Sequence, residues 1–502
     1  MSTERKTFPG GYRFKNFGGQ PRAITITPEI PKKVAVPLKQ GFGVELPPMV
    51  SPGDRVAAGQ VLGRDDEAVS SPIHSSVNGI VESITELDLS GYKTKAVVIE
   101  SDGSSEWRSI DGFSKDWRSL SPEKIEELLY LSGVTSLGSG GIPTRFKSSV
   151  INPQEVEHVI VHHTEADVFN HSLSSIWAED GVGPGPGGVA QFCEGLEMLR
   201  KLMPRVTLHV VLCASQKTWL KAVENCVTED RQIRLYAVKP KYPQSFDEVL
   251  VQTVLQKNFP FGYRAVNMGV LVLDFLVLRH IYESVTLGKP LIDRLIALSG
   301  PRFRENTHLR ARIGTSVGDI VSGRLIETDA SRYVWNSVLT GGRITDLASP
   351  VTRDHSSIIA LAENGTDPLF PFARPGSKQD SFSNTFIAKL LPFRRESNTS
   401  IHGEKRACLS CNFCSDVCPV GILPQMLHRY VERNMINEKL VEYKILRCID
   451  CNLCSYVCPS KIAVARFMRE GKEKLKIEGF DVSGGDLSGY QLRGLEEYQG
   501  LK

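Results

Sequence analysis

The chain has 502 residues, of which 41% are hydrophobic and 23% are charged, and its formal net charge is +3. This length is enough for three or four domains, and the composition is that of an ordinary globular protein. A net charge this close to zero gives no reason to expect a nucleic-acid partner.

Neither a secretory signal nor a membrane span is expected. The N-terminus reads MSTERKTFPGG and has no apolar segment of the kind that a signal peptide requires. The longest apolar stretch, residues 265–278, contains Asn267 and Asp274 and is too short to cross a bilayer. We therefore expect a protein that is cytosolic or bound peripherally to the inner face of a membrane.

A flattened barrel is predicted over residues 1–100. The run PPMVSPGDRVAAGQVLG, followed by SSPIHSSVNGIVESI, resembles the lipoyl and biotinyl domains, with turns at Gly53 and Gly59. Carrier domains of that fold attach their prosthetic group to a lysine at a hairpin tip. The corresponding stretch here, GRDDEAVSS, has three acids and no lysine. We expect a docking or packing domain.

A Rossmann-like α/β domain is predicted over residues 121–299. A helix with Ser121 as its N-cap comes first. Strand-like runs then alternate with helical patterns, at residues 157–163, 187–203, 205–214, 217–226 and 232–239. This alternation favours a parallel sheet covered by helices, which binds its ligands beyond the carboxyl ends of the strands. Glu165 and Asp167 follow the first of these strands.

A glycine-rich stretch, LGSGGIPTRFK at residues 137–147, lies just before the first strand. Its glycines allow close approach to a ligand, and the amide groups of such a loop can hold a phosphate, although the same residues also suit a surface turn. A second run, GVGPGPGG, contains two prolines that remove amide donors, so a stiff connection is the better explanation there. His162 and His163 are adjacent on a strand and point to opposite faces, so we do not expect them to bind one ion.

The remaining part before the cysteine runs is predicted to hold a β-grasp domain and a linker. Short strand patterns with turn signals cover residues 300–365, and residues 366–402 are rich in Pro, Ser and basic residues. Within the linker, FIAKLLPFRR fits contact with a membrane surface or an integral partner subunit, and fits a solvated linker equally well.

The strongest motif is a pair of cysteine runs, ACLSCNFCSDVCP and RCIDCNLCSYVCP, which hold eight of the eleven cysteines. Each run is C-x2-C-x2-C-x3-C-P, the pattern typical of ferredoxins with two [4Fe–4S] clusters. The first three thiolates of a run bind one cubane, and the fourth reaches the other cubane. The predicted ligand sets are therefore Cys408, Cys411, Cys414 and Cys458 for one cluster, and Cys448, Cys451, Cys454 and Cys418 for the second.

The cluster module is predicted over residues 403–475, with helices at residues 423–443 spacing the two runs apart and a tail at residues 476–502. Disulfides among these cysteines would require an oxidising compartment, and zinc sites usually have longer separations between cysteine pairs. The scattered Cys193, Cys213 and Cys226 are predicted to be small buried hydrophobic residues.

The order of these parts resembles the C subunit of Rnf-type electron-transport complexes. The motifs TFPGGYRF, SPIHSSVNGIV and the two cysteine runs carry the resemblance over residues 5–475. Residues 293–325 and FARPGS are closer to the related A subunit of sodium-pumping NADH:quinone reductases, which lacks iron–sulfur motifs. The chain thus resembles two homologous families in different regions.

The resemblance implies an FMN site at SLGSGGIPTRFK, which corresponds to GLGGAGFPTHVK or similar in the Rnf family. Ser136, Ser139, Gly140 and Ile142 depart from that pattern, and Ile142 replaces an aromatic residue. The downstream acid pair of the family falls on Glu165 and Asp167. The implied cofactor-binding residues are Gly138, Gly140, Gly141, Thr144, Lys147, Glu165 and Asp167.

The function implied by the resemblance is electron transfer from NADH through FMN and two [4Fe–4S] clusters to integral-membrane partner subunits that couple the flow to ion transport. A flavin is needed because a hydride carries two electrons and each cubane accepts one. The implied location is peripheral, at the cytoplasmic face of the inner membrane. Two alternatives stay open: a flavin-free relay between ferredoxin and a membrane complex that also contacts quinone, and a soluble protein like the cobalamin reductases.

Overall fold

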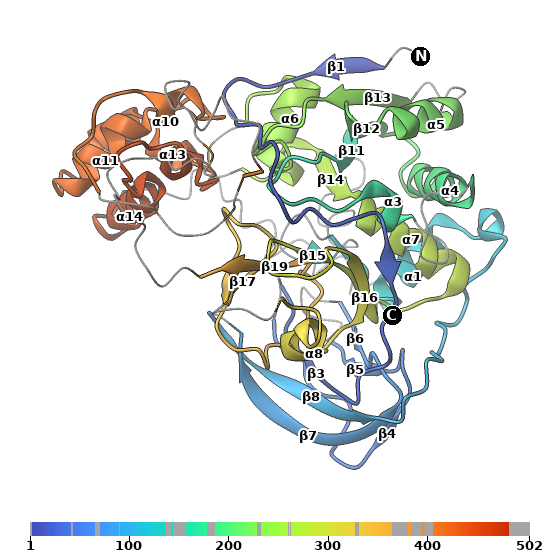
Figure 1. Cartoon of the computed structure of the whole chain (residues 1–502). Coiled ribbons are helices and arrows are strands. Elements are labelled where there is room, and N and C mark those ends of the chain that lie inside the picture. The colour runs from blue at the N-terminus through green and yellow to red at the C-terminus, as the bar shows by residue number, and fades with distance from the viewer. Residues whose placement is uncertain are drawn as a thin grey trace.

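The computed structural model shows a multidomain α/β protein with a cluster module beside it (Figure 1). A parallel sheet, a six-stranded sheet and a barrel follow one another from top to bottom in that view, and the cysteine-rich module lies to one side. The structure describes residues 3–41, 44–65, 71–89, 91–136, 142–143, 156–177, 186–227, 232–259, 261, 263–326, 331–363, 380, 382, 394–395, 397 and 405–480.

The parallel sheet has the strand order β1-β13-β12-β11-β14, and each neighbouring pair runs parallel. Its strands are β1 (Glu4–Lys6), β11 (His158–His163), β12 (Thr207–Cys213), β13 (Ile233–Val238) and β14 (Val270–Asp274). The predicted alternation of strands and helices is confirmed. The edge strand β1 was not expected here, because residues 1–100 were assigned to the barrel.

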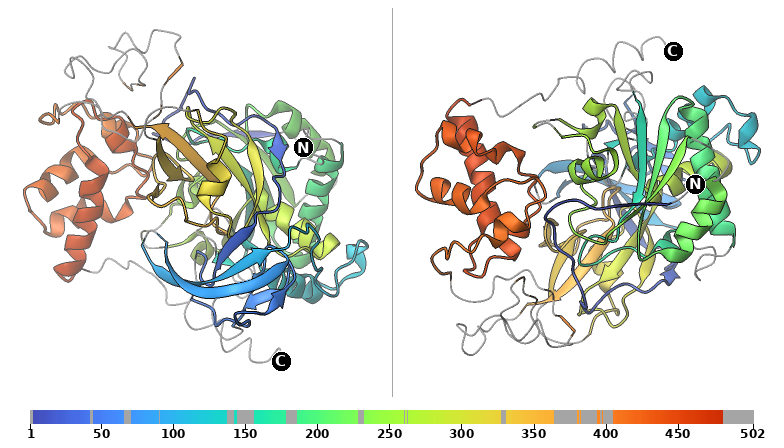
Figure 2. Two further views of the ribbon diagram at one scale, coloured as in Figure 1. Left: turned by 60° about the horizontal axis from the view of Figure 1, so that its bottom comes forward. Right: turned by 90° about the horizontal axis from the view of Figure 1, so that it is seen from above.

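Helices cover both faces of this sheet, as the view from above shows (Figure 2). They are α1 (Pro122–Leu131), α3 (Leu173–Ile176), α4 (Pro186–Leu202), α5 (Lys217–Val227), α6 (Asp247–Leu255) and α7 (Phe275–Leu287). Neighbouring residues of β11 point to opposite faces. Val159 and Val161 therefore join the core under α1, α4, α5 and α7, and Ile160 joins the core under α6. Ser121 caps α1 as predicted, since its hydroxyl accepts a hydrogen bond from the Lys124 amide at 3.2 Å.

A disulfide joins α4 to α5 through Cys193 and Cys226. The prediction that both are small buried hydrophobic residues is therefore wrong, because the two helices lie side by side and bring the sulfurs together. Cys213, on β12, is buried and free, as predicted.

The six-stranded sheet has the order β18-β17-β19-β15-β16-β2. Its strands are β2 (Thr25–Ile26), β15 (Asp293–Ser299), β16 (His308–Arg312), β17 (Ser331–Trp335), β18 (Arg343–Ile344) and β19 (Ser357–Ala362), and the helix α8 (Val317–Val321) packs on them. Residues 293–299, which the sequence analysis places in the α/β domain, form strand β15 of this sheet. Strand β15 pairs with β16 and β19 and so belongs to this sheet.

The barrel begins at residue 33, because the residues before it serve the two sheets as β1 and β2. Its strands are β3 (Lys33–Pro37), β4 (Arg55–Val56), β5 (Val61–Gly63), β6 (Ile73–His74), β7 (Gly79–Asp88) and β8 (Lys93–Ser101). Gly53 and Gly59 lie in turns, as predicted, with φ of 93° and 88°. A side chain at Gly59 would meet the Arg108 carbonyl oxygen at 2.5 Å, so this turn requires glycine.

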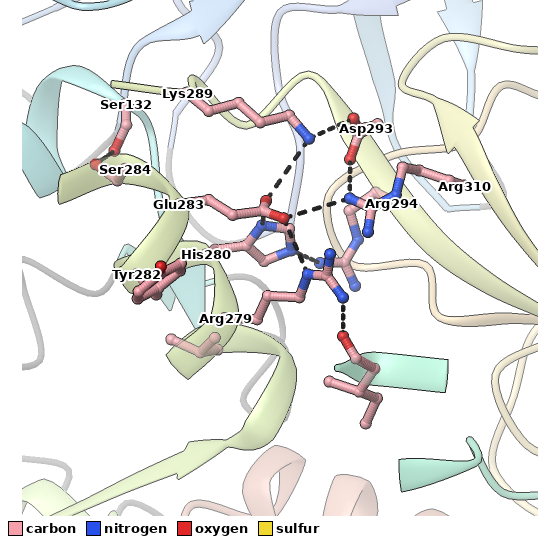
Figure 3. A network of polar contacts seen from close by, with 12 residues as sticks. Ser132, Arg279, His280, Tyr282, Glu283, Ser284, Lys289, Asp293, Arg294 and Arg310 are labelled. Atoms are coloured by element: carbon pink, nitrogen blue, oxygen red, sulfur yellow. Dashed lines mark hydrogen bonds and ion pairs between the residues drawn. The ribbon is translucent and has the colours of Figure 1, made fainter. Parts of the chain in front are cut away.

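A buried network of ion pairs joins α7 to the strands β15 and β16 (Figure 3). The Glu283 carboxylate lies 2.9 Å from Arg279, 3.5 Å from Arg310 and 3.6 Å from Lys289. Asp293 pairs with the same Lys289 at 2.7 Å and the same Arg310 at 3.4 Å. Burial opposes ionisation of Glu283, but Lys289, Arg279 and Arg310 outweigh it and hold its pKa well below the ordinary value. The network fixes the parallel sheet against the six-stranded sheet.

The cysteine-rich module consists of two similar halves. Its helices are α10 (Phe413–Asp416), α11 (Pro424–Glu432), α12 (Glu438–Glu442), α13 (Leu453–Tyr456) and α14 (Val464–Ile477). The helices predicted between the two runs are confirmed as α11 and α12. Asn412 and Asn452 precede α10 and α13 with φ of 63° and 62°, so both cysteine runs turn in the same way. In the part of the chain that the structure describes, no helix has the length and apolarity that a membrane span needs.

Candidate functional site

The eight cysteines of the module form two groups of four. Burial raises the pKa of the Cys414 thiol to about 12, and the nearby Cys458, Cys411 and Cys408 add to the shift. The fourth cysteine of the second run therefore lies with the first three of the first run.

The second group has the reverse composition. Burial raises the pKa of Cys451 to about 12, with contributions from Cys448 and Cys418. The pKa of Cys454 is raised well above its ordinary value by burial and by neighbours that include Cys414 of the first group. The two groups are thus adjacent, and each unites the cysteines of one predicted ligand set.

The donor chemistry of these groups suits a [4Fe–4S] cluster. All eight cysteines are free of disulfides, which excludes the disulfide alternative in this structure. Among the described residues, no set of three or more His, Cys, Asp or Glu side chains closes around a single metal ion. Four thiols on tight loops, with the fourth preceding a proline, are the ligand arrangement of paired cubanes.

The two groups differ in exposure. In the group Cys408, Cys411, Cys414 and Cys458, which we call the outer group, Cys411 is exposed. Leu409, which lies between Cys408 and Cys411 in the chain, is 68% exposed. In the group Cys448, Cys451, Cys454 and Cys418, the inner group, each thiol is buried or half-buried. The Lys472 ammonium donates to the Cys448 carbonyl at 3.2 Å and brings a positive charge to the inner group.

A cavity of about 220 Å³ lies at the carboxyl edge of the parallel sheet, next to β11 and β14. Its walls are formed by the end of β11 and the residues after it, by the loop after β13, by the end of β14 and the start of α7, and by the six-stranded sheet with its loops. The lining residues include His162, His163, Glu165, Asp167, His171, Ser245, Asp274, Ala297, Asn336 and Ser356. The strand order reverses between β11 and β14, since β12 and β13 lie on one side of β11 and β14 on the other. Open α/β sheets bind ligands at such a switch point.

Glu165 and Asp167 both line this cavity, but they have different partners. Glu165 accepts hydrogen bonds from Ser215 at 2.8 Å and from Gln216, which follow β12. Burial raises the pKa of Asp167 to about 6, and a hydrogen bond from Ser337 opposes the shift. Asp167 therefore faces the six-stranded sheet, and Glu165 remains beside the carboxyl ends of the strands.

The predicted glycine-rich loop is only partly described. Strands β9 (Thr135–Ser136) and β10 (Ile142–Pro143) pair antiparallel and enclose it in the chain. The predicted cofactor-binding residues Gly138, Gly140, Gly141, Thr144 and Lys147 lie outside the described residues.

Two histidines of the cavity wall, His163 and His171, have pKa values below the ordinary value. Burial lowers the pKa of His163, and burial together with His308 lowers the pKa of His171 well below the ordinary value. His163 packs on Phe275 with ring centroids 5.9 Å apart. Sequence reasoning missed His171 as a cavity residue, since nothing in the sequence places it beside the six-stranded sheet.

The contact between the module and the parallel sheet was also missed. The Tyr242 hydroxyl donates to the Cys451 carbonyl at 2.9 Å, and the Gly11 amide donates to the Val417 carbonyl at 2.8 Å. Gly11 belongs to TFPGGYRF, which contributed to the family resemblance but was given no structural role. The only sequence signal was therefore the motif itself.

Three domain families match parts of the chain. They are the RnfC barrel-sandwich hybrid domain at residues 6–104, the NQRA C-terminal domain at residues 295–346 and the 4Fe-4S dicluster domain at residues 407–462. The match at residues 295–346 begins within β15, in agreement with the pairing of that strand. The predicted mosaic of Rnf-like and NADH:quinone reductase-like parts is confirmed.

The whole-chain relatives are also C subunits of ion-translocating oxidoreductase complexes. The chain is 25% identical over 461 residues to the C subunit of the proton-translocating ferredoxin:NAD(+) oxidoreductase complex of Clostridium ljungdahlii, covering 91% of each chain. It is 26% identical to the C subunit of the ion-translocating oxidoreductase complex of Haemophilus influenzae, with 88% of this chain and 61% of that one covered. For the corresponding C subunit of Vibrio cholerae the identity is 25%, and the match spans 84% of this chain and about half (49%) of that relative.

A NAD+-reducing [NiFe]-hydrogenase structure aligns with 77% of this chain and 65% of its own, at a TM-score of 0.43 and 11% identity. The expected resemblance to the C subunit of Rnf-type complexes is confirmed by the domain matches and by the relatives.

Proposed function

Because this chain is similar to the C subunits of Rnf-type complexes over most of its length, we propose that it transfers electrons between NADH and partner subunits of an ion-translocating ferredoxin:NAD+ oxidoreductase complex. The parallel-sheet domain would hold FMN and the module would hold two [4Fe–4S] clusters, which would supply the redox chemistry of this transfer. The observation that carries the proposal is the grouping of the eight cysteines into two crossed sets of four, next to the sheet edge that holds the cavity.

The inner group would bind one cluster and the outer group the other. Buried thiols whose pKa values lie at about 12 stay protonated on their own, so cluster assembly must release their protons. Each group takes three cysteines from one run and the fourth from the other run, so each bound cluster would join the two halves of the module. Loss of the fourth cysteine of a run, Cys418 or Cys458, should therefore affect the cluster of the opposite run.

The cavity at the switch point is the proposed place for the reacting ring of the flavin or the nicotinamide. Its volume of about 220 Å³ is below the roughly 300–1,000 Å³ of whole ligand sites, so it would hold one ring system. Bound FMN would supply the exchange between a two-electron hydride and the single electrons that the clusters accept. Glu165, oriented by Ser215 and Gln216, would accept hydrogen bonds from the ligand.

The phosphate of FMN is assigned to the glycine-rich loop, through Gly138, Gly140, Gly141, Thr144 and Lys147. This assignment rests on the family pattern and on the loop's place between β9 and β10. The cavity wall carries the carboxyl groups of Glu165, Asp167 and Asp274. An anionic phosphate is therefore better placed at the loop, where Lys147 supplies a cation.

We further propose a domain division that follows the strands. The barrel comprises residues 33–101, the Rossmann-like flavin domain residues 121–292, the β-grasp domain residues 293–363, and the module residues 405–480. Residues 366–402 remain a proposed linker and residues 481–502 a proposed tail. The proposed location is peripheral, on the cytoplasmic face of the inner membrane, with integral-membrane partner subunits.

The test is anaerobic reconstitution of the full chain with iron, sulfide and FMN. We expect about eight irons, bound FMN and bleaching of the cluster absorbance when NADH is added. Glu165→Gln should slow the bleaching and leave the iron content unchanged, whereas the exposed barrel residue Glu86, changed to Gln, serves as the control. Absence of iron after reconstitution would contradict the cluster proposal. Full iron without FMN binding or NADH response would contradict the flavin proposal.

A second candidate is a flavin-free relay between ferredoxin and the membrane complex, with a contact to quinone. The match of residues 295–346 to the NQRA C-terminal domain favours it. The same reconstitution separates the two candidates, because the relay predicts clusters that reduced ferredoxin reduces and NADH does not.

A further inference from the structure

We propose that Tyr242 positions the inner cysteine group against the cavity. The cluster bound by Cys448, Cys451, Cys454 and Cys418 is then the one that exchanges electrons with the α/β domain. The proposal rests on the function proposed above, because it concerns the order of the two clusters along that electron path.

Tyr242 lies in the loop that follows β13, at the carboxyl edge of the parallel sheet. Its side chain is 1% exposed, and its hydroxyl donates to the Cys451 carbonyl at 2.9 Å. Phe14 and Phe246 pack edge-on against its ring, with centroids 5.9 Å and 5.8 Å away. The tyrosine thus reaches from the sheet domain into the loop that carries the inner cysteines.

The same loop forms part of the cavity wall. Ser245, three residues after Tyr242, lines the cavity, and so does Asp167. One short segment, residues 242–245, therefore contacts an inner-group cysteine at one end and the cavity at the other.

The N-terminal segment, residues 10–12, also contacts both Tyr242 and the cysteine-rich module, and we call this meeting point of the three segments the junction. The backbones of Tyr12 and Tyr242 exchange two hydrogen bonds, of 2.9 Å and 2.8 Å. The adjacent Gly11 amide donates to Val417, and a Cβ at Gly10 would come within 2.6 Å of the Cys418 carbonyl oxygen.

Two cysteine loops of the inner group, those of Cys451 and Cys418, are therefore fixed by the same junction. The outer group presents the exposed Cys411 and is the one open to a partner. This difference sets the order of the clusters, with the inner one nearer the cavity.

Removing the hydroxyl of Tyr242 leaves the ring in place and takes away the donor to Cys451. The Cys451 loop then loses its hydrogen bond to the sheet domain, and the Cys451 carbonyl loses the Tyr242 hydroxyl as its donor. Cluster potentials respond to hydrogen bonding and solvent access, and small displacements of reacting groups change rates by up to about a hundredfold. If Tyr242 positions the inner group, its substitution should change the potential of the inner cluster and leave that of the outer cluster unchanged.

The experiment compares the reconstituted full chain with Tyr242→Phe and with Tyr236→Phe as the matched control. Tyr236 is another buried tyrosine, on β13, whose hydroxyl lies 3.2 Å from the His209 ring nitrogen. Dithionite titrations followed by EPR give the midpoint potential of each cluster, and Cys411→Ala and Cys451→Ala identify the outer and inner signals. This readout needs neither NADH nor FMN, so it stands even if the flavin proposal fails.

We expect Tyr242→Phe to shift or remove the inner signal alone, and to slow NADH-driven reduction of both clusters by about tenfold or more. Tyr236→Phe should leave both signals and the rate unchanged. Unchanged signals in Tyr242→Phe, a change confined to the outer signal, an equal shift of both signals or the loss of both clusters would overturn the proposal.

Discussion

The ion network around Glu283 makes a quantitative prediction for the substitution Glu283→Gln. The carboxylate side chain is 10% exposed and faces three cations within 3.6 Å: Arg279, Lys289 and Arg310. Glutamine has nearly the same shape, so the substitution removes the charge without opening a cavity. The cations then lie in a buried site with one carboxylate fewer.

The expected loss of stability depends on whether each cation around Glu283 keeps another partner. Removing one member of a buried ion pair costs about 3–5 kcal/mol. Lys289 and Arg310 retain Asp293, at 2.7 Å and 3.4 Å, whereas Arg279 retains the Ile176 carbonyl. The lower end of the range, about 3 kcal/mol, is therefore expected, or a fall of about 6–12 °C in the melting temperature.

The assay is thermal unfolding of the full chain followed by circular dichroism at a fixed scan rate. The control is Glu86→Gln, which removes an exposed pair with Lys93 at 3.1 Å and should cost at most about 1 kcal/mol. Because the pKa of Glu283 is depressed in the folded state, its contribution is complete above about pH 4.3 and disappears as the pH falls through the folded-state value. Equal melting temperatures for Glu283→Gln and Glu86→Gln at pH 7 would refute the role of the network.

Three further predictions concern the cysteines, the cavity and the N-terminal segment. Cys418→Ser should damage the cluster of the Cys448 run and spare that of the Cys408 run, as EPR of the reduced protein would show; damage to the Cys408 cluster would contradict the crossed ligand sets. Burial raises the pKa of Asp167 to about 6, so its ionisation destabilises the fold as the pH rises through that value. Asp167→Asn should therefore raise the melting temperature by about 2–4 °C at pH 7.5 and have less effect at pH 5, and the opposite order would refute the assignment. Gly10→Ala should loosen the module, because φ is 66° and the new Cβ would lie 2.6 Å from a carbonyl oxygen; limited proteolysis that cuts the variant no faster than the wild type would count against this contact.

The local elements could be predicted from sequence because each has its own periodicity or spacing. The helix capped by Ser121, the strands β11, β12 and β13 and the helices between the cysteine runs all follow from patterns within about twenty residues. The two ligand sets also follow from spacing, since a four-residue offset before proline carries the last thiolate of each run toward the other. These predictions need no knowledge of distant contacts.

The parts that could not be predicted depend on contacts between segments far apart in the chain. β1 and β2 are only three and two residues long, and each completes a sheet whose other strands come more than a hundred residues later. Tyr242 meets Cys451 across 209 residues of sequence. The disulfide of Cys193 and Cys226 depends on the side-by-side packing of α4 and α5. No periodicity marks such residues, so only the fold identifies them.

The most direct test of electron transfer is an anaerobic absorption and EPR measurement on the full chain reconstituted with iron, sulfide and FMN, before and after the addition of NADH. We predict two interacting [4Fe–4S] signals that appear on NADH addition, together with loss of the visible cluster absorbance. A reconstituted chain that binds no iron, or whose clusters are reduced by dithionite but never by NADH, would contradict the proposed electron path.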